Sequence, residues 1–325
     1  MRGVLARKLV TAAAIVSVGV LLALAVRHDA DGQPAGTDVL LAAGDVSPDP
    51  GWTNADDYAT SELVLRELAR SPAAVVAGLG DLQYEAGDGA AFASQLGYAG
   101  SWGRFAERTC PAPGNHEYMT PGAAGFFDYF GERLAACATS GRPDLGWYAF
   151  DLPASGWRWY VLSSDCGRNG GSPACGAGSA QLAWLAADLQ ANAGRRCIGA
   201  YWHHERWGSR APFGDDAAVA GFWNALNHVH ADLVLVGHSH AYARLGPMTP
   251  SGHLSPLGAG IRQLTVGTGG KSLIAFSTTP REGTRYRDAA HYGVLRLQLT
   301  ATTWASSFVR TDGVVADQVS AGCWP

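Results

Sequence analysis

The order of apolar and polar positions along the chain predicts alternating strands and helices. Short apolar runs typical of buried strands end at residues 43, 79, 202 and 236, and polar residues follow each run. Apolar residues at helical spacing predict helices over 56–70, 179–193 and 217–230. The first helix is expected to end before Ser71-Pro72, because proline disfavours helical backbone in the preceding residue.

Residues 147–152 and 157–163 predict a β-hairpin. After residue 260 the pattern changes to strands only, with strands expected over 261–266, 292–299 and 303–310 and a short one near Val314. Strand–helix units followed by a late antiparallel run predict an α/β (α+β) fold, a four-layer α-β-β-α sandwich of two mixed sheets flanked by helices. No repeat or interior linker interrupts residues 38–325, which we expect to form one catalytic domain.

The N-terminal segment has a different character. Basic residues precede an apolar run over residues 9–26, so residues 1–26 predict a signal peptide or a membrane anchor, and residues 27–37 a linker. Ala23-Leu24-Ala25 is a candidate cleavage site, but the run is also just long enough to span a membrane. The protein is therefore expected to be secreted or extracytoplasmic, with attachment to the membrane through residues 9–26 left open.

Charge and cysteine content narrow the partners and the compartment. The formal net charge is −4 and no basic stripe is visible, which argues against a nucleic-acid partner. An even number of cysteines after an export signal predicts disulfides, and no Cys-x-x-Cys supports a thiolate metal site. Cys166 and Cys175 flank a glycine-rich octapeptide and are expected to pair. For the other four cysteines, the expected pairs are Cys110–Cys137 and Cys197–Cys323.

Metal-binding side chains gather after the predicted strands. His238 and His240 stand two apart, so on extended backbone they point to the same side and could serve two adjacent ions. In open α/β sheets, sites form at the carboxyl ends of strands. Oxygen and nitrogen donors without thiolate suit Fe, Zn or Mn, and two ions that share a carboxylate could use them all. The candidate ligands are Asp45, Asp81, Tyr84, Asn115, His203, His238 and His240.

The order of these motifs resembles the calcineurin-like metallophosphoesterase superfamily, and most closely its purple acid phosphatase-like branch. Many members open with Asp-x-His, whereas this chain has Asp45-Val46-Ser47. Tyr84 stands three residues after Asp81, as in purple acid phosphatases, and the alternative is that it is only a packed core aromatic. The motifs are Gly44-Asp45, Gly80-Asp81-x-x-Tyr84, Gly114-Asn115-His116-Glu117, Trp202-His203-His204 and Gly237-His238-Ser239-His240.

The resemblance implies a role for each ligand. Asp45, Tyr84 and His240 would hold the first metal ion, and Asp81 would bridge to the second. The second ion would be held by Asn115, His203 and His238. A tyrosinate ligand favours Fe(III), so the implied cofactors are Fe(III) with Fe(II), Zn or Mn.

The resemblance also implies the reaction, the hydrolysis of small phosphate monoesters by in-line attack of a metal-bound hydroxide. Besides Asp81, the implied catalytic residues are His116, which would contact substrate or protonate the leaving group, and His204. The family usually has proline where Glu205 stands, which leaves the role of His204 open between substrate contact and support of a ligand. Two alternatives stay open: a phosphodiesterase acting on nucleotides or lipid head groups, and a non-catalytic surface binding module.

Overall fold

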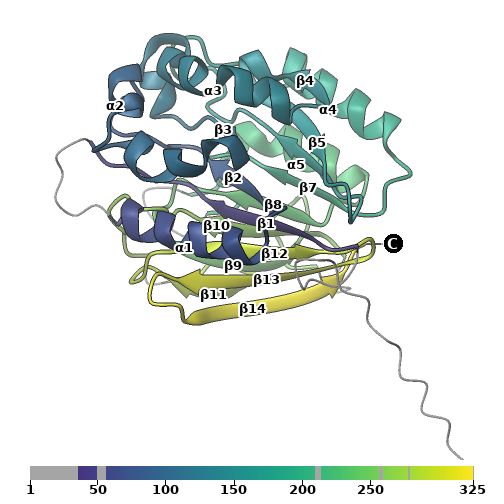
Figure 1. Cartoon of the computed structure of the whole chain (residues 1–325). Coiled ribbons are helices and arrows are strands. Elements are labelled where there is room, and N and C mark those ends of the chain that lie inside the picture. Colours follow the sequence, from purple (N-terminus) through teal and green to yellow (C-terminus); the bar gives the residue numbers. More distant parts are fainter. Residues whose placement is uncertain (1–35, 50–55, 209–213, 256–258, 277–278, 325) are drawn as a thin grey trace, which may run out of the picture.

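The computed structural model describes residues 36–49, 56–208, 214–255, 259–276 and 279–324. Within them, two β-sheets pack face to face and helices cover both outer surfaces (Figure 1). The predicted four-layer α-β-β-α sandwich is confirmed. The signal peptide or anchor expected over residues 1–26, and most of the linker after it, lie outside the described residues. No helix within the described ranges has the length and apolarity that a membrane crossing needs.

The first sheet has six strands in the order β14-β13-β12-β1-β2-β3. Strands β1, β2 and β3 are parallel to one another, whereas β12, β13 and β14 extend the sheet as antiparallel neighbours. Helices α1 (Asp57–Arg70) and α3 (Ala124–Cys137) contact this sheet, and the short α2 (Gly89–Ala93) contacts α3. The strands are β1 (Asp38–Ala43), β2 (Val75–Leu79), β3 (Thr109–Ala112), β12 (Gly293–Leu299), β13 (Thr303–Arg310) and β14 (Val315–Gly322).

The second sheet has eight strands in the order β11-β9-β10-β8-β7-β6-β5-β4. Its centre, β6-β7-β8-β10, is parallel, and antiparallel strands flank it on both sides. Helices α4 (Ala180–Ala191) and α5 (Ala220–His228) cover its outer face. The strands are β4 (Ser140–Arg142), β5 (Trp147–Asp151), β6 (Arg158–Val161), β7 (Ile198–Tyr201), β8 (Leu233–Val236), β9 (Tyr242–Met248), β10 (Ile261–Val266) and β11 (Thr284–Asp288).

Strand β8 shows why the central strands are uninterrupted apolar runs. Leu233 and Leu235 belong to the core cluster that includes both sheets, whereas Val234 and Val236 pack into the cluster with α4 and α5. Successive side chains of a strand point to opposite faces. Both faces of β8 are buried, so every position in the strand is apolar. The polar residues therefore come only after the strand ends.

Most predicted elements are confirmed, and the differences have simple causes. Helix α3 was not predicted, although Phe126, Phe130 and Leu134 are buried at helical spacing. Strand β9 contains Gly246 and Pro247, which are disfavoured in strands, and β11 is rich in charged residues at a sheet edge, so neither showed a strand pattern. The last strand, expected to be short, has 8 residues because it pairs along β13.

All three expected disulfides are present in the described part of the chain. Cys110–Cys137 joins β3 to the last residue of α3, and Cys166–Cys175 closes the loop between β6 and α4. Cys197 directly precedes β7 and Cys323 directly follows β14, so this bond joins the two sheets. Disulfides persist in oxidising compartments, which indicates an extracellular or secreted protein.

The disulfides should differ in their contribution to stability. Cys197–Cys323 closes a loop with a sequence separation of 126, against 9 for Cys166–Cys175. Because loop-closure entropy grows with loop length, removing the long-range bond should lower the free energy of unfolding by about 5 kcal/mol, and removing the short one by about 3 kcal/mol. Urea unfolding of the two double Cys→Ser variants measures this difference. The reverse order of losses would contradict the entropic explanation.

Candidate metal centre

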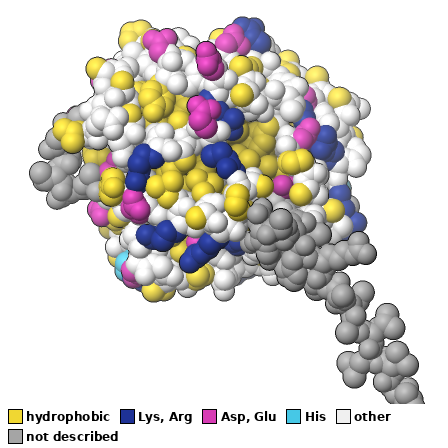
Figure 2. All heavy atoms as spheres, in the orientation of Figure 1, with side chains coloured by type: hydrophobic (Ala, Val, Ile, Leu, Met, Phe, Trp, Pro, Cys, Tyr) yellow, Lys and Arg dark blue, Asp and Glu magenta, His cyan; other side chains and the backbone are white. Residues whose placement is uncertain are grey.

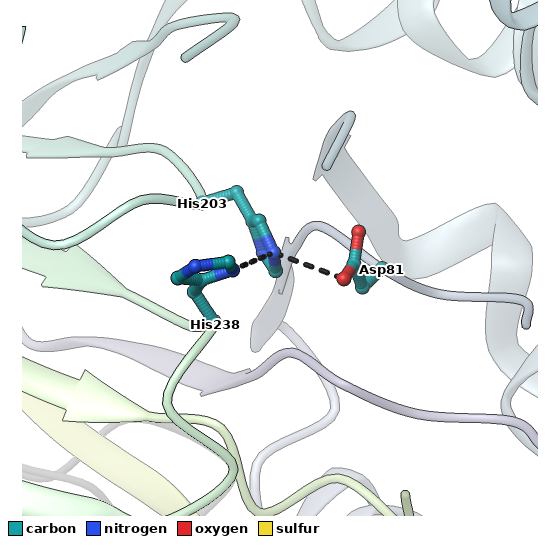
Figure 3. Close-up of side chains that lie close together, drawn as sticks. All are labelled: Asp81, His203 and His238. Atoms are coloured by element: carbon teal, nitrogen blue, oxygen red, sulfur yellow. Dashed lines mark hydrogen bonds and ion pairs between the residues drawn. The ribbon is translucent and has the colours of Figure 1, made fainter. Parts of the chain in front are cut away.

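The ends of four parallel strands bring the polar side chains together. Asp45 follows β1 and Asp81 follows β2 in the six-stranded sheet, whereas His203 and His238 follow β7 and β8 in the eight-stranded sheet. The strands within each pair are parallel neighbours, so their carboxyl ends lie at the same edge. Asp81, His203 and His238 point toward one another from the two sheets (Figure 3).

The site is not open on every side of the molecule. On the face shown in Figure 2, Lys and Arg side chains lie interspersed with Asp and Glu around hydrophobic atoms, and histidine is visible only at the margin. Asp45 and His203 have no exposed surface, and Asp81 is also buried. Burial of carboxylates without compensation costs several kcal/mol, so this concentration of them needs a chemical reason.

Left-handed backbone directs several of these side chains. The φ angles of Asp45, Asp81, His238 and His240 are 58°, 50°, 71° and 40°. Residues other than glycine are uncommon in this region, at a cost of about 1–3 kcal/mol each, and they cluster at functional sites. Neighbouring glycines also allow close approach, because a Cβ atom on Gly114 would lie 2.1 Å from Oδ1 of Asp81.

A first cluster forms around the phenol of Tyr84. Its Oη atom lies 2.8 Å from Oδ1 of Asp45, 3.0 Å from Oδ2 of Asp81 and 3.0 Å from Nε2 of His240. Nε2 of His240 also lies 3.2 Å from Oδ1 of Asp45, and its Nδ1 lies 2.9 Å from the carbonyl of Ser272. That carbonyl accepts a hydrogen bond from Nδ1–H, so Nε2 is left to face the cluster.

Electrostatics in the first cluster favour an added positive charge. Burial and the carboxylates of Asp45 and Asp81 raise the pKa of the Tyr84 phenol well above its usual value. Burial raises the pKa of Asp45, but the imidazole of His240 outweighs it and keeps that pKa low. The phenol therefore donates to the carboxylates, and only a cation among them would make its deprotonation favourable.

Ser47 occupies the place where many metallophosphoesterases have a histidine. Its hydroxyl donates to Oδ2 of Asp57, on α1, at 2.9 Å and lies 2.9 Å from Oγ of Ser101. These contacts join Ser47 to a buried polar group beside α1. Tyr84, which contacts Asp45, Asp81 and His240 directly, is thus the side chain that completes the first cluster.

A second cluster forms around His203. Nε2 of His203 lies 3.0 Å from Oδ2 of Asp81 and 3.2 Å from Nδ1 of His238, and one donor atom from each of the three residues lies within 4.8 Å of the others. Nδ1 of His203 lies 2.9 Å from the carbonyl of Leu79, which assigns the proton to Nδ1 and directs Nε2 into the cluster.

The two imidazoles of this cluster have opposite pKa shifts. Burial lowers the pKa of His203, but the carboxylate of Asp81 outweighs it and raises that pKa to about 10. Burial, with the nearby imidazole of His203, lowers the pKa of His238 to about 4, so His238 is neutral at neutral pH. A neutral imidazole beside a carboxylate is a suitable donor for a cation.

One carboxylate oxygen belongs to both clusters. Oδ2 of Asp81 lies 3.0 Å from the phenol of Tyr84 and 3.0 Å from Nε2 of His203. Its other oxygen accepts the backbone N–H of His116 at 2.9 Å, next to Asn115. The side-chain oxygen of Asn115 is buried and has no hydrogen-bond partner among the described residues. A buried acceptor of this kind fits a metal ion better than a packed core.

The two other candidate histidines, His116 and His204, lie beside the clusters. Nδ1 of His116 lies 2.5 Å from the carbonyl of Glu85, and its Nε2 lies 3.9 Å from Oδ2 of Asp81. The ring of His204 packs against that of His238 in a tilted arrangement, with 4.5 Å between ring centroids, and its Nδ1 lies 2.9 Å from Oγ of Ser164. Burial and the imidazole of His238 lower the pKa of His204 well below its usual value.

A polar cleft of about 320 Å³ opens beside His204 and His238. Arg168, from the loop closed by Cys166–Cys175, donates to both carboxylate oxygens of Asp216 at 2.7 and 2.6 Å. The described lining contains no aromatic side chain apart from the two histidines, which suits a small polar ligand. The lining residues are Arg168, His204, Glu205, Gly214, Asp215, Asp216 and His238.

Glu117 ends the motif Gly114-Asn115-His116-Glu117, but the sequence predicted no role for it. Its carboxylate is fully buried and accepts backbone N–H groups of Asp81, Leu82, Gln83 and Gly114 at 2.9, 2.7, 3.3 and 2.6 Å. Burial and the charge of Asp81 raise the pKa of Glu117 to about 7, whereas these N–H groups favour its ionised form. Glu117 therefore fixes the loops that carry Asp81 and Asn115.

Comparison with known proteins agrees with this geometry. The model of the calcineurin-like phosphoesterase family matches residues 22–242, more than half of the chain. The chain belongs to the calcineurin-like phosphoesterase family. Calcineurin-like phosphoesterases are metallophosphoesterases, hydrolases that use two metal ions. A comparison with curated protein sequences found no match.

Solved structures with the same fold include two phosphatases and a protein described as an anchor. Purple acid phosphatase PPD1 from yellow lupin (Lupinus luteus) is 16% identical with a TM-score of 0.66, and the match covers 89% of this chain and 55% of the lupin chain. A dimetal phosphatase from Danio rerio is 12% identical with a TM-score of 0.55, covering 88% and 99%. GAP50, described as the anchor in the inner membrane complex of Plasmodium, is 10% identical with a TM-score of 0.61, covering 89% and 90%. This chain thus spans about half of the lupin enzyme.

The four N–H groups bound by Glu117 predict a large effect of a small change. Glu117→Gln keeps the shape but replaces one acceptor oxygen by an N–H₂ group that faces two backbone donors. The free energy of unfolding of the metal-stripped protein should fall by about 2–5 kcal/mol in urea titrations, because two buried donors lose their acceptor. The control is Glu62→Gln, at an exposed pair with Arg104, which should leave the free energy of unfolding nearly unchanged. Equal losses in the two variants would contradict the role of Glu117.

Proposed function

We propose that this protein is an exported phosphatase that hydrolyses small phosphate monoesters at a two-metal centre. The observation that carries the proposal is the position of Oδ2 of Asp81, 3.0 Å from both Tyr84 and His203. A single carboxylate oxygen shared by two clusters is suited to bridge a pair of ions.

The two clusters supply a ligand set for each ion. Asp45, Tyr84 and His240 would hold the first, with Asp81 between the two. Asn115, His203 and His238 would hold the second, and the unpartnered oxygen of Asn115 supports this assignment. Carboxylate, phenolate, amide and imidazole donors without thiolate suit Fe, Zn or Mn.

Tyr84 supports iron in the first position. Phenolate is a hard oxygen donor, and hard, highly charged ions such as Fe(III) are the ions best able to remove the phenol proton. Fe(II), Zn or Mn fits the second set, which has two imidazoles and an amide. The purple acid phosphatase-like branch shares this tyrosine, which favours the same chemistry here.

The side chains around the centre can bind the substrate and transfer a proton. The two ions would supply a hydroxide nucleophile and neutralise charge on the phosphoryl oxygens. Nδ1–H of His116 donates to the carbonyl of Glu85, so Nε2 is left for the centre, and in the imidazolium form it would donate a proton to a leaving group. His204 lines the cleft beside His238 and would contact a phosphoryl oxygen of the substrate. The polar cleft would accept the remainder of a small ester.

Two other functions use the same fold. A phosphodiesterase needs room for a second ester arm, which the cleft beside His204 could also provide. The alternative of a binding module is suggested by GAP50, which is described as an anchor. In this chain the complete set of donor side chains around Asp81 favours catalysis.

Export is supported by the disulfides and by the predicted N-terminal segment. The three disulfides require an oxidising environment to form. Residues 1–26 would direct the chain out of the cytoplasm, and attachment to a membrane would be through residues 9–26.

Replacement of Asp81 tests the proposed activity. Asp81→Asn keeps the side-chain shape and the acceptor for the His116 N–H but removes the bridging charge. For p-nitrophenyl phosphate, kcat/KM should fall at least about 100-fold, which is ~2.7 kcal/mol of transition-state stabilisation. The control Asp144→Asn removes an exposed carboxylate paired with Arg142 and should leave kcat/KM unchanged.

Bis-p-nitrophenyl phosphate, measured in parallel, separates the two enzymatic alternatives. A larger kcat/KM for the diester would replace the monoesterase proposal by the phosphodiesterase. A wild-type protein that hydrolyses neither ester, or an Asp81→Asn variant that retains full activity, would exclude a hydrolase acting through this centre.

A further inference from the structure

Glu205 is a buried carboxylate at the edge of the cleft, and the proposed reaction assigns it no step. Only 3% of the residue is exposed, and it follows His203 and His204 in the loop after β7. Its Oε1 accepts a hydrogen bond from Oγ1 of Thr265 at 2.6 Å, and its Oε2 accepts a short hydrogen bond from Oγ of Ser239. A charge withdrawn from water in this way needs strong partners, and hydroxyl donors to a carboxylate are among the stronger hydrogen bonds.

Ser239 connects this carboxylate to the second histidine loop. It lies between His238 and His240, one from each cluster, and is fully buried. Backbone pairing between the loops includes the bond from the Gly237 N–H to the His203 carbonyl at 3.0 Å. Farther along the two loops, a side-chain hydrogen bond from Ser239 to Glu205 joins one loop to the other.

The histidine loop needs such a connection because its backbone is strained. His238 and His240 both have left-handed φ angles, on either side of Ser239. Conformations of this kind persist only where the surroundings hold them in place. Thr265, which donates the other hydrogen bond to Glu205, lies in β10 and pairs with Val236 of β8, directly before the loop.

We propose that Glu205 is a positioning residue that sets the spacing between His203 and the His238–His240 pair through Ser239. This inference rests on the proposed two-metal centre and adds the group that holds its two histidine loops in register. Supporting groups that orient metal ligands typically change metal affinity 10–100-fold when they are removed. Glu205 contacts neither ion in this scheme and acts only through Ser239.

Zinc binding to the metal-stripped full-length protein tests the inference, with Zn²⁺ in competition with a chromophoric chelator. Ser239→Ala should raise the zinc dissociation constant about 10–100-fold. Thr265→Val is the matched control, because it removes the other hydroxyl from the same carboxylate, on a strand without a ligand. Its zinc affinity should stay closer to wild type than to Ser239→Ala. Both variants lose one buried hydrogen bond, so their thermal midpoints without metal should shift by similar amounts.

Glu205→Asp provides a second test that does not depend on the folding of Ser239→Ala. It keeps the negative charge but shortens the side chain by one methylene, so the carboxylate no longer reaches both hydroxyls. Its zinc dissociation constant should also rise, and a value equal to wild type would overturn the inference.

The outcomes separate this inference from the proposed function. A wild-type protein that binds no zinc would remove the metal centre itself. A wild-type protein that binds zinc, with Ser239→Ala binding it equally well, would overturn the role of Glu205 and leave the centre intact. Equal losses of affinity in Ser239→Ala and Thr265→Val would show a general stabilising effect and would overturn the positioning role as well.

Discussion

The structure depends on the burial of two carboxylates, Asp45 and Asp81, at the meeting point of two sheets. Both contact the phenol of Tyr84, and Asp81 also contacts His203. Burial raises the pKa of the Tyr84 phenol, and the two carboxylates beside it raise that pKa further. The same field that disfavours a phenolate attracts cations. The site therefore favours positive charge, which the imidazoles of His203 and His240 supply in part and which bound metal ions would increase.

The rest of the fold holds this charge in place. Parallel strands that are apolar on both faces end together, so their polar successors meet at one edge of the sandwich. Left-handed backbone at the ligands directs them inward, and buried acceptors restrain the loops that carry them. Glu117 restrains the loops of Asp81 and Asn115 on the side of the six-stranded sheet. Glu205 restrains the histidine loop on the side of the eight-stranded sheet through Ser239.

The sequence predicted what depends on local pattern and missed what depends on contacts between distant loops. The apolar runs before Asp45, Asp81, His203 and His238 revealed both the strands and the polar groups at their ends. The spacing of its phenylalanines could have predicted helix α3. Strands β9 and β11, in contrast, form through pairing with neighbouring strands, and their own sequences show little strand pattern. The supporting carboxylates were not predictable, because the partners of Glu117 and Glu205 lie 3 to 60 residues away in sequence.

The visible absorption spectrum of the purified protein, recorded with its metal content, tests the central claim most directly. The claim is that Tyr84 completes the first metal site in place of a histidine. The account predicts about two metal ions per chain, including iron, and a charge-transfer band that disappears in Tyr84→Phe. The band should persist in the control Tyr148→Phe, whose buried phenol donates to the Pro111 carbonyl. An iron-containing protein whose band survives in Tyr84→Phe, or a fully active protein without iron and without colour, would contradict the claim.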